Sequence, residues 1–170
     1  MKVVVADTSP LNYLVLIGEV DLLERLYGEV LIPDIVAREL SDPEAPSAVV
    51  QWAAHFPSWV NVCPTPVSAE RLERLDAGER AAILLAEAQT SDVLLLVDDA
   101  AGRAEAERRH IPSTGTLGII RAAGIRHFTD IPTALTRLRS TNFRCTALLF
   151  DELLAEDAQR RSGGRLEPPK

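Results

Sequence analysis

KVVVADTSP, residues 2–10, is the stretch of sequence that decides the fold. Its valine-rich first half is typical of a buried strand, and its polar second half is typical of a turn that opens a helix. A second stretch of this kind, VLLLVDD at residues 93–99, contains the most apolar segment of the chain and also ends in acids. Two buried strands, each followed by a helical pattern, indicate neighbours in a parallel sheet.

Outward from these two stretches, short strands alternate with helical patterns. We expect further strands at residues 30–32 and 60–63, and a short edge strand at residues 111–113. A long helical pattern begins at Ala69 and breaks at Asp76-Ala77-Gly78. This alternation predicts an α/β fold in which helices cover both faces of a parallel sheet.

The length and composition predict a single globular domain. The chain has 170 residues, too few for two ordinary domains, and its 46% hydrophobic and 25% charged residues exclude a disordered chain. We expect the domain to cover residues 1–158, with a last helix at 147–158, and the Gly- and Pro-containing end, residues 159–170, to be disordered. No apolar run is long enough for a membrane span or a signal peptide, so we expect a cytoplasmic protein without a membrane partner. Cys63 and Cys145 lie far apart in the sequence, which predicts reduced thiols.

Charge and residue usage exclude several classes of function. The net charge of −7 argues against a protein that binds nucleic acid by broad neutralisation of phosphates, although not against a metal-dependent enzyme. A phosphoacceptor receiver domain would need a lysine in a late loop, and the only lysines are Lys2 and Lys170. The three histidines show no spacing typical of a zinc site or a nucleophilic triad.

Acids follow the two most apolar strands directly. Asp7 follows the first, and the pair Asp98-Asp99 follows the second. Ligands of a parallel sheet bind outside the carboxyl ends of its strands, where three carboxylates would lie close together. Neighbouring carboxylates in a cleft disfavour each other's ionised forms. A divalent cation such as Mg²⁺, which prefers oxygen ligands, would offset this repulsion.

Each acid also has an ordinary structural explanation. Asp7 could cap a helix, Asp98-Asp99 could form a turn and a cap, and Glu79 could be a favourable acid in the first turn of a helix. Glu39, near the end of the helix that Pro33 opens, could be a solvated side chain. Their order along the chain favours a common site.

Five short motifs in this order resemble the PIN domain, over about residues 1–155. The motifs are Asp7-Thr8-Ser9-Pro10-Leu11, Ile32-Pro33 leading to Glu39-Leu40, Gly78-Glu79-Arg80-Ala81-Ala82-Ile83, Leu95-Leu96-Val97-Asp98-Asp99 and Gly115-Thr116-Leu117-Gly118. The chain is most similar to the branch related to toxins of bacterial and archaeal toxin–antitoxin pairs. The resemblance implies a three-layer α/β/α PIN-like fold with a central, mostly parallel sheet.

The resemblance further implies a metal-dependent endoribonuclease that uses Mg²⁺ or Mn²⁺. The matching motifs imply that Asp7 is the first metal ligand. They also imply that Glu39 and Glu79 are the second and third catalytic acids and that Asp98 is the fourth. Many relatives place the fourth acid deeper in its loop, so Asp99 is the substitute for Asp98 as a metal ligand. An RNA substrate, an antitoxin protein as partner and a homodimer are implied as well.

Three hydroxyl residues are expected to contact the substrate. Thr8 and Ser9 would support a metal-bound water or a substrate phosphate. Thr116, in the stretch 114–118, could present its hydroxyl and backbone N–H to a phosphate at a helix N-terminus. That stretch lacks the lysine of a Walker loop, so a simple helix start is the alternative.

Two alternatives concern binding surfaces. The basic residues Arg103, Arg108, Arg109 and His110 could contact RNA, but the interleaved acids suggest an ordinary solvated helix face. The alternative to the enzyme is a non-catalytic PIN-like module that dimerises and binds a protein partner, for which the leucines within 148–154 could provide a surface.

Overall fold

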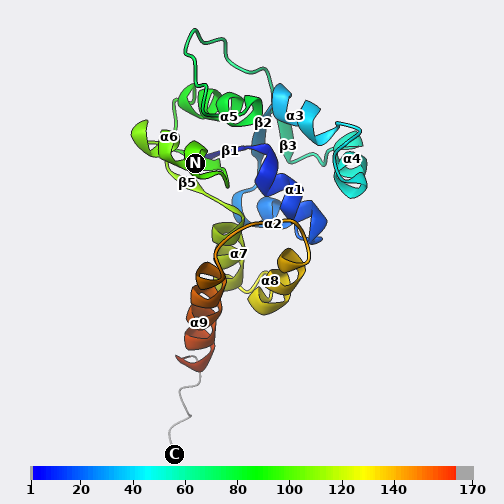
Figure 1. The fold of residues 1–170 in the computed structure, drawn as a ribbon, viewed down its shortest axis with the longest axis vertical. Coiled ribbons are helices and arrows are strands. Elements are labelled where there is room, and N and C mark those ends of the chain that lie inside the picture. Colours follow the sequence, from blue (N-terminus) through cyan, green and yellow to red (C-terminus); the bar gives the residue numbers. More distant parts are fainter. Residues whose placement is uncertain (1, 164–170) are drawn as a thin grey trace, which may run out of the picture.

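A five-stranded parallel sheet forms the centre of the structure, a computed structural model that describes residues 2–163 (Figure 1). The strands are β1 (Val3–Ala6), β2 (Val30–Pro33), β3 (Val60–Cys63), β4 (Val93–Leu96) and β5 (Ser113–Thr114). They lie in the order β3-β2-β1-β4-β5, and every adjacent pair is parallel. The predicted α/β fold is confirmed, and the two most apolar strands, β1 and β4, are neighbours as expected.

Nine helices within residues 2–163 connect and cover the strands. They are α1 (Thr8–Leu16), α2 (Leu22–Tyr27), α3 (Asp34–Leu40), α4 (Ser47–Ala54), α5 (Ala77–Glu87), α6 (Ala100–Arg108), α7 (Thr116–Ile125), α8 (Ile131–Arg139) and α9 (Ala147–Gly163). α9 extends away from the sheet at one end of the molecule (Figure 1). No helix in this part of the chain is both long and apolar enough to cross a membrane.

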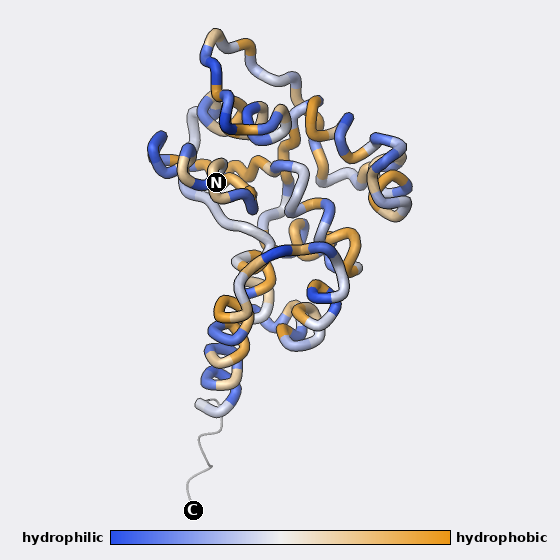
Figure 2. The backbone as a smooth tube through the Cα atoms, in the orientation of Figure 1, coloured by the Kyte–Doolittle hydropathy of each residue, from blue (hydrophilic) through white to orange (hydrophobic). Residues whose placement is uncertain are grey.

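The sheet separates two apolar cores, which gives the three layers of the fold. Val4 and Ala6 of β1 pack into the larger core with α1, α3, α7 and α8, whereas Val5 packs into the smaller core with α5 and α6. All three side chains are essentially inaccessible to solvent. Because both faces of β1 are covered, the strand is a continuous apolar run. In Figure 2, hydrophobic residues are seen in the helices around the sheet as well as in its centre.

Three predicted elements have different bounds in the structure. Residues 69–75 form turns and irregular chain, not a helix, because a helix of about two turns with so few apolar residues cannot bury a stable face. The edge strand is shorter than predicted and shifted to Ser113–Thr114. The predicted end of the last helix at Ala158 is too early, since α9 continues to Gly163. The remainder of the predicted tail, 164–170, lies outside the described residues.

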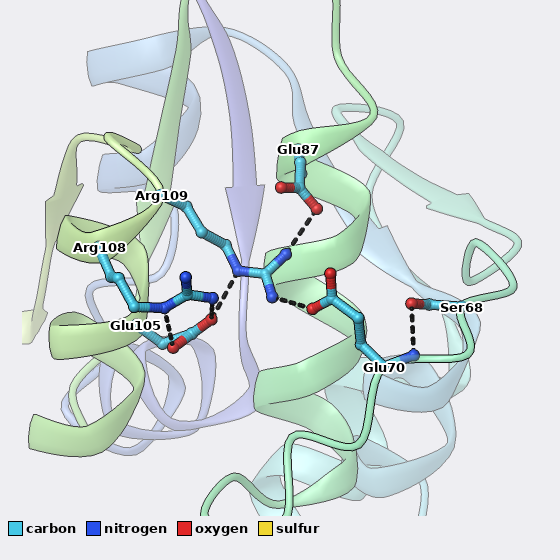
Figure 3. Close-up of polar contacts among 6 residues, drawn as sticks. All are labelled: Ser68, Glu70, Glu87, Glu105, Arg108 and Arg109. Carbon is cyan, nitrogen blue, oxygen red and sulfur yellow. Dashed lines mark hydrogen bonds and ion pairs between the residues drawn. The ribbon is translucent and has the colours of Figure 1, made fainter.

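Arg109 connects three carboxylates from separate parts of the chain (Figure 3). Its side chain is 5% exposed, and its guanidinium donates hydrogen bonds to Glu105 of α6 at 2.6 Å, to Glu87 of α5 at 2.7 Å and to Glu70. Hydrogen bonds from Arg108 and Arg109 lower the pKa of Glu105 to about 2. Glu70 belongs to the irregular segment before α5, so this cluster fixes the segment that leads into the N-terminus of α5.

We expect Arg109→Ala to lower the free energy of unfolding by about 2 kcal/mol, because its charge-assisted hydrogen bonds are lost and Glu70 and Glu87 lose their ion-pair partner. Arg108→Ala is the matched control. Arg108 also bonds Glu105, but its side chain is 65% exposed, and its loss should cost less than about 1 kcal/mol. Urea unfolding measures both variants, and equal losses would contradict the role given to Arg109.

Candidate active site

The sheet register brings the ends of β1 and β4 to the same level. Ala6 is paired with Leu96, and the backbone N–H of Asp7 donates to the carbonyl of Leu96 at 2.9 Å. The residues that follow these strands therefore leave the sheet side by side. This is the edge where the sequence predicts the acids to meet.

Asp7 is buried at this edge, with 2% of its surface exposed. It occupies the N-cap position of α1, but its side chain makes no capping hydrogen bond, and its buried Oδ1 has no hydrogen-bond partner. Burial raises the pKa of Asp7 well above its usual value. The backbone N–H of Thr8 opposes this rise, whereas the charges of Asp76, Glu79 and Glu39 add to it. The capping explanation therefore does not account for this side chain.

Glu39 and Asp7 approach each other against Gly78, at the start of α5. A Cβ atom at position 78 would lie 3.0 Å from Asp7 Oδ1 and closer still to Glu39 Oε2. The glycine thus provides the space that both carboxylates occupy. The hydroxyl of Thr8 donates to Glu39 Oε2, so Glu39 is a partly buried, hydrogen-bonded side chain and not a solvated one.

Glu79 is buried in the first turn of α5, where it forms a capping box with Asp76. The Glu79 N–H donates to Asp76 Oδ1 at 2.8 Å, and the Asp76 N–H donates to Glu79 Oε2 at 3.2 Å. Burial, followed by the charges of Asp76 and Asp99, raises the pKa of Glu79 to about 7. Asp76 is an acid that the sequence analysis did not select, although an aspartate three residues before a glutamate is the signal of such a box.

The adjacent acids after β4 make different contacts. Asp98 accepts hydrogen bonds from the N–H and the hydroxyl of Thr116, both at 2.7 Å, and burial raises its pKa. Asp99 is exposed and caps α6 as expected, accepting from the N–H groups of Ala101 at 2.8 Å and Gly102 at 3.2 Å. Thr116 is fully buried, with both donors directed at Asp98, so it supports this acid from behind.

An open cleft of about 560 Å³ lies over this edge of the sheet. Its wall includes Asp76, Glu79, Asp98 and Asp99, together with Ser9. Both of the adjacent acids after β4, Asp98 and Asp99, therefore line the cleft. A cavity of similar size beside α9, about 600 Å³, contains none of the predicted site residues.

The donor set fits a hard divalent cation. Within residues 2–163, no three His, Cys, Asp or Glu side chains are close enough, as they stand, to hold a metal ion. The carboxylate oxygens of Asp7 and Glu39 nevertheless meet at Gly78, Glu79 is the next residue of α5, and the buried Oδ1 of Asp7 has no hydrogen-bond partner. A cation is the ligand that would satisfy this oxygen and reduce the mutual repulsion that raises the pKa values.

Comparison with known families identifies the architecture. The family model described as PIN domain (DUF3368) matches residues 3–159 of this chain. The match includes the whole sheet and all the acids described above. No curated protein and no solved structure matches the chain.

The raised pKa of Glu79 predicts how the stability of the metal-free protein depends on pH. The folded state binds this proton more tightly than the unfolded chain, so the stabilisation is present below the ordinary pKa of 4.5 and is lost as pH rises through about 7. Over this pH range the free energy of unfolding of the wild type should fall by roughly 2 kcal/mol more than that of Glu79→Gln, because glutamine cannot ionise. Urea unfolding in EDTA on both sides of the range measures the difference.

Glu29→Gln is the control for this prediction, because Glu29 is exposed between α2 and β2. It should keep the pH dependence of the wild type. The same pH dependence in Glu79→Gln would show that Glu79 titrates normally in the folded protein.

Proposed function

The chain belongs to the PIN-domain family, whose members are generally nuclease-like, and on that premise we propose that it is a metal-dependent endoribonuclease that hydrolyses RNA phosphodiester bonds. The observation that carries the proposal is the approach of Asp7 and Glu39 to each other at Gly78, next to Glu79 in the first turn of α5, with Asp7 Oδ1 buried without a hydrogen-bond partner. The fold offers this oxygen no hydrogen bond, which is the arrangement expected of a metal ligand.

Asp7, Glu39 and Glu79 would hold Mg²⁺ or Mn²⁺, and Asp98 or its neighbour Asp99 would complete the set. When bound, the cation supplies a water of lowered pKa and stabilises negative charge on the phosphate. The products expected from the family carry 5′-phosphate and 3′-hydroxyl ends.

Neighbouring side chains orient these acids. The hydroxyl of Thr8 holds Glu39, the capping box with Asp76 holds Glu79, and Thr116 holds both oxygens of Asp98. Ser9 lines the cleft, where its hydroxyl would donate to a substrate phosphate. An acidic cleft repels RNA, so the cation is needed for substrate affinity as well as for chemistry.

We further propose that this nuclease is the toxin of a toxin–antitoxin pair and forms a homodimer. It rests on the resemblance of the motifs to that branch of the family. Leu148 and Leu149 of α9 are 64% and 47% exposed, which supports a protein-binding surface. A small antitoxin-like reading frame beside the gene, and co-purification of its product with this chain, would test the pairing.

We expect Asp7→Asn to abolish metal-dependent RNA cleavage and to leave the fold intact, because it removes a ligand without changing side-chain volume. Millimolar Mn²⁺ should raise the melting temperature of the wild type, since a cation bound only by the folded state stabilises it, and should not raise that of Asp7→Asn. Asp21→Asn, an exposed acid before α2, is the matched control. Wild-type cleavage by Asp7→Asn would remove Asp7 from the site.

The adjacent acids after β4 can be separated in the same assay. Asp98→Asn should reduce cleavage by orders of magnitude, whereas Asp99→Ala should mainly cost about 1 kcal/mol of stability through loss of the α6 cap. Thermal unfolding of each variant separates loss of activity from loss of folding. An inactive Asp99→Asn beside a fully active Asp98→Asn would reverse the assignment, and normal cleavage by both would leave the site without a fourth acid.

A further inference from the structure

We infer that Arg103 and Arg144 bind the RNA phosphates that flank the cleavage site, and this inference rests on the proposed function. Both arginines line the cleft that contains Asp98 and Asp99, and they come from two different parts of the chain. Arg103 belongs to α6, and Arg144 to the connection between α8 and α9. They are the two cationic side chains among the residues that line the cleft, which include four carboxylates.

The arginines in α6 and at its C-cap divide into two groups by their contacts. Arg108 and Arg109 are held by Glu105, as an ordinary charged helix face would require. Arg103, one turn into the same helix, is exposed and has no ion pair or side-chain hydrogen bond within residues 2–163. Arg103 lines the same cleft as Asp98 and Asp99. Arg103 is therefore free to bind an anion at the cleft.

The position of Arg144 is fixed by its neighbours in the chain. The hydroxyl of Tyr13 in α1 donates to Asn142 Oδ1 at 3.0 Å, and the Tyr13 ring meets the Phe143 ring edge-on at 5.0 Å between centroids. Phe143 packs in turn on Phe150 of α9 at 6.4 Å. These contacts hold the α8–α9 connection against the cleft, while Arg144 itself is exposed and unpaired among the described residues.

The charge of the cleft explains why two free guanidinium groups are needed. Four carboxylates line the wall, and a bound divalent cation would neutralise only part of their charge. RNA adds a negative charge with every nucleotide, so the phosphates on either side of the reacting one require cations of their own. Guanidinium groups bind phosphate through paired hydrogen bonds, which makes an unpaired arginine the suitable side chain.

Steady-state cleavage of a short single-stranded RNA in Mn²⁺ tests the inference. Arg103→Ala and Arg144→Ala should each raise KM about tenfold, with little change in kcat, because they remove substrate binding and leave the acids in place. Each should also reduce the slope of log KM against log salt concentration by about 0.7, the value for one phosphate contact on a single strand. A merely structural role would not change this slope.

Arg126→Ala is the matched control, because Arg126 is also exposed and unpaired within residues 2–163 but lies at the C-cap of α7, outside the cleft. It should keep the KM and the salt slope of the wild type. If the wild type cleaves RNA and the two cleft variants behave like Arg126→Ala, the inference is overturned and the proposed function stands. If the wild type shows no metal-dependent cleavage, the proposed function is overturned and the inference with it.

Discussion

The burial of Asp7 at the end of the central strand is the constraint on which the candidate site depends. β1 lies between β2 and β4, and the side chains of Val5 and Ala6 are fully buried, so the chain cannot move Asp7 into solvent without breaking the sheet. Burial disfavours the charged form of a carboxylate that lacks compensating hydrogen bonds. The fold therefore holds Asp7 where a proton or a cation is needed to balance it.

Residues at the start of α5 complete this arrangement, because they leave room for the carboxylates and orient one of them. Gly78 leaves the volume that the carboxylates of Asp7 and Glu39 fill, and the capping box with Asp76 fixes Glu79 on the helix. A helix N-terminus favours negative charge, which partly offsets the repulsion among these acids. The Arg109 cluster anchors the irregular segment that precedes α5, so a contact remote from the acids helps to set their position.

The sequence predicts those features that depend on neighbours in the chain. Apolar runs predict β1 and β4, and acids placed after them predict the edge where Asp7 and Asp98 lie. The contacts that join distant segments were not predictable in this way. Asn142, which lines the cleft, is bonded by Tyr13, far away in the sequence. The sequence of α6 and its C-cap does not distinguish Arg103, which has no ion pair among the described residues, from the paired Arg109. Asp76 was predictable and was missed, because its role follows from a local capping signal.

Structural and functional explanations of these acids are compatible for most of them. Asp98 holds the start of α7 through Thr116, Asp99 caps α6, and Glu79 belongs to a capping box, so the fold alone would justify each of these side chains. Asp7 differs, because its Oδ1 is buried and receives no hydrogen bond from any described residue. A buried carboxylate oxygen without a hydrogen-bond partner costs stability. Its presence is explained by a ligand that binds there, and this makes Asp7 the most informative residue of the candidate site.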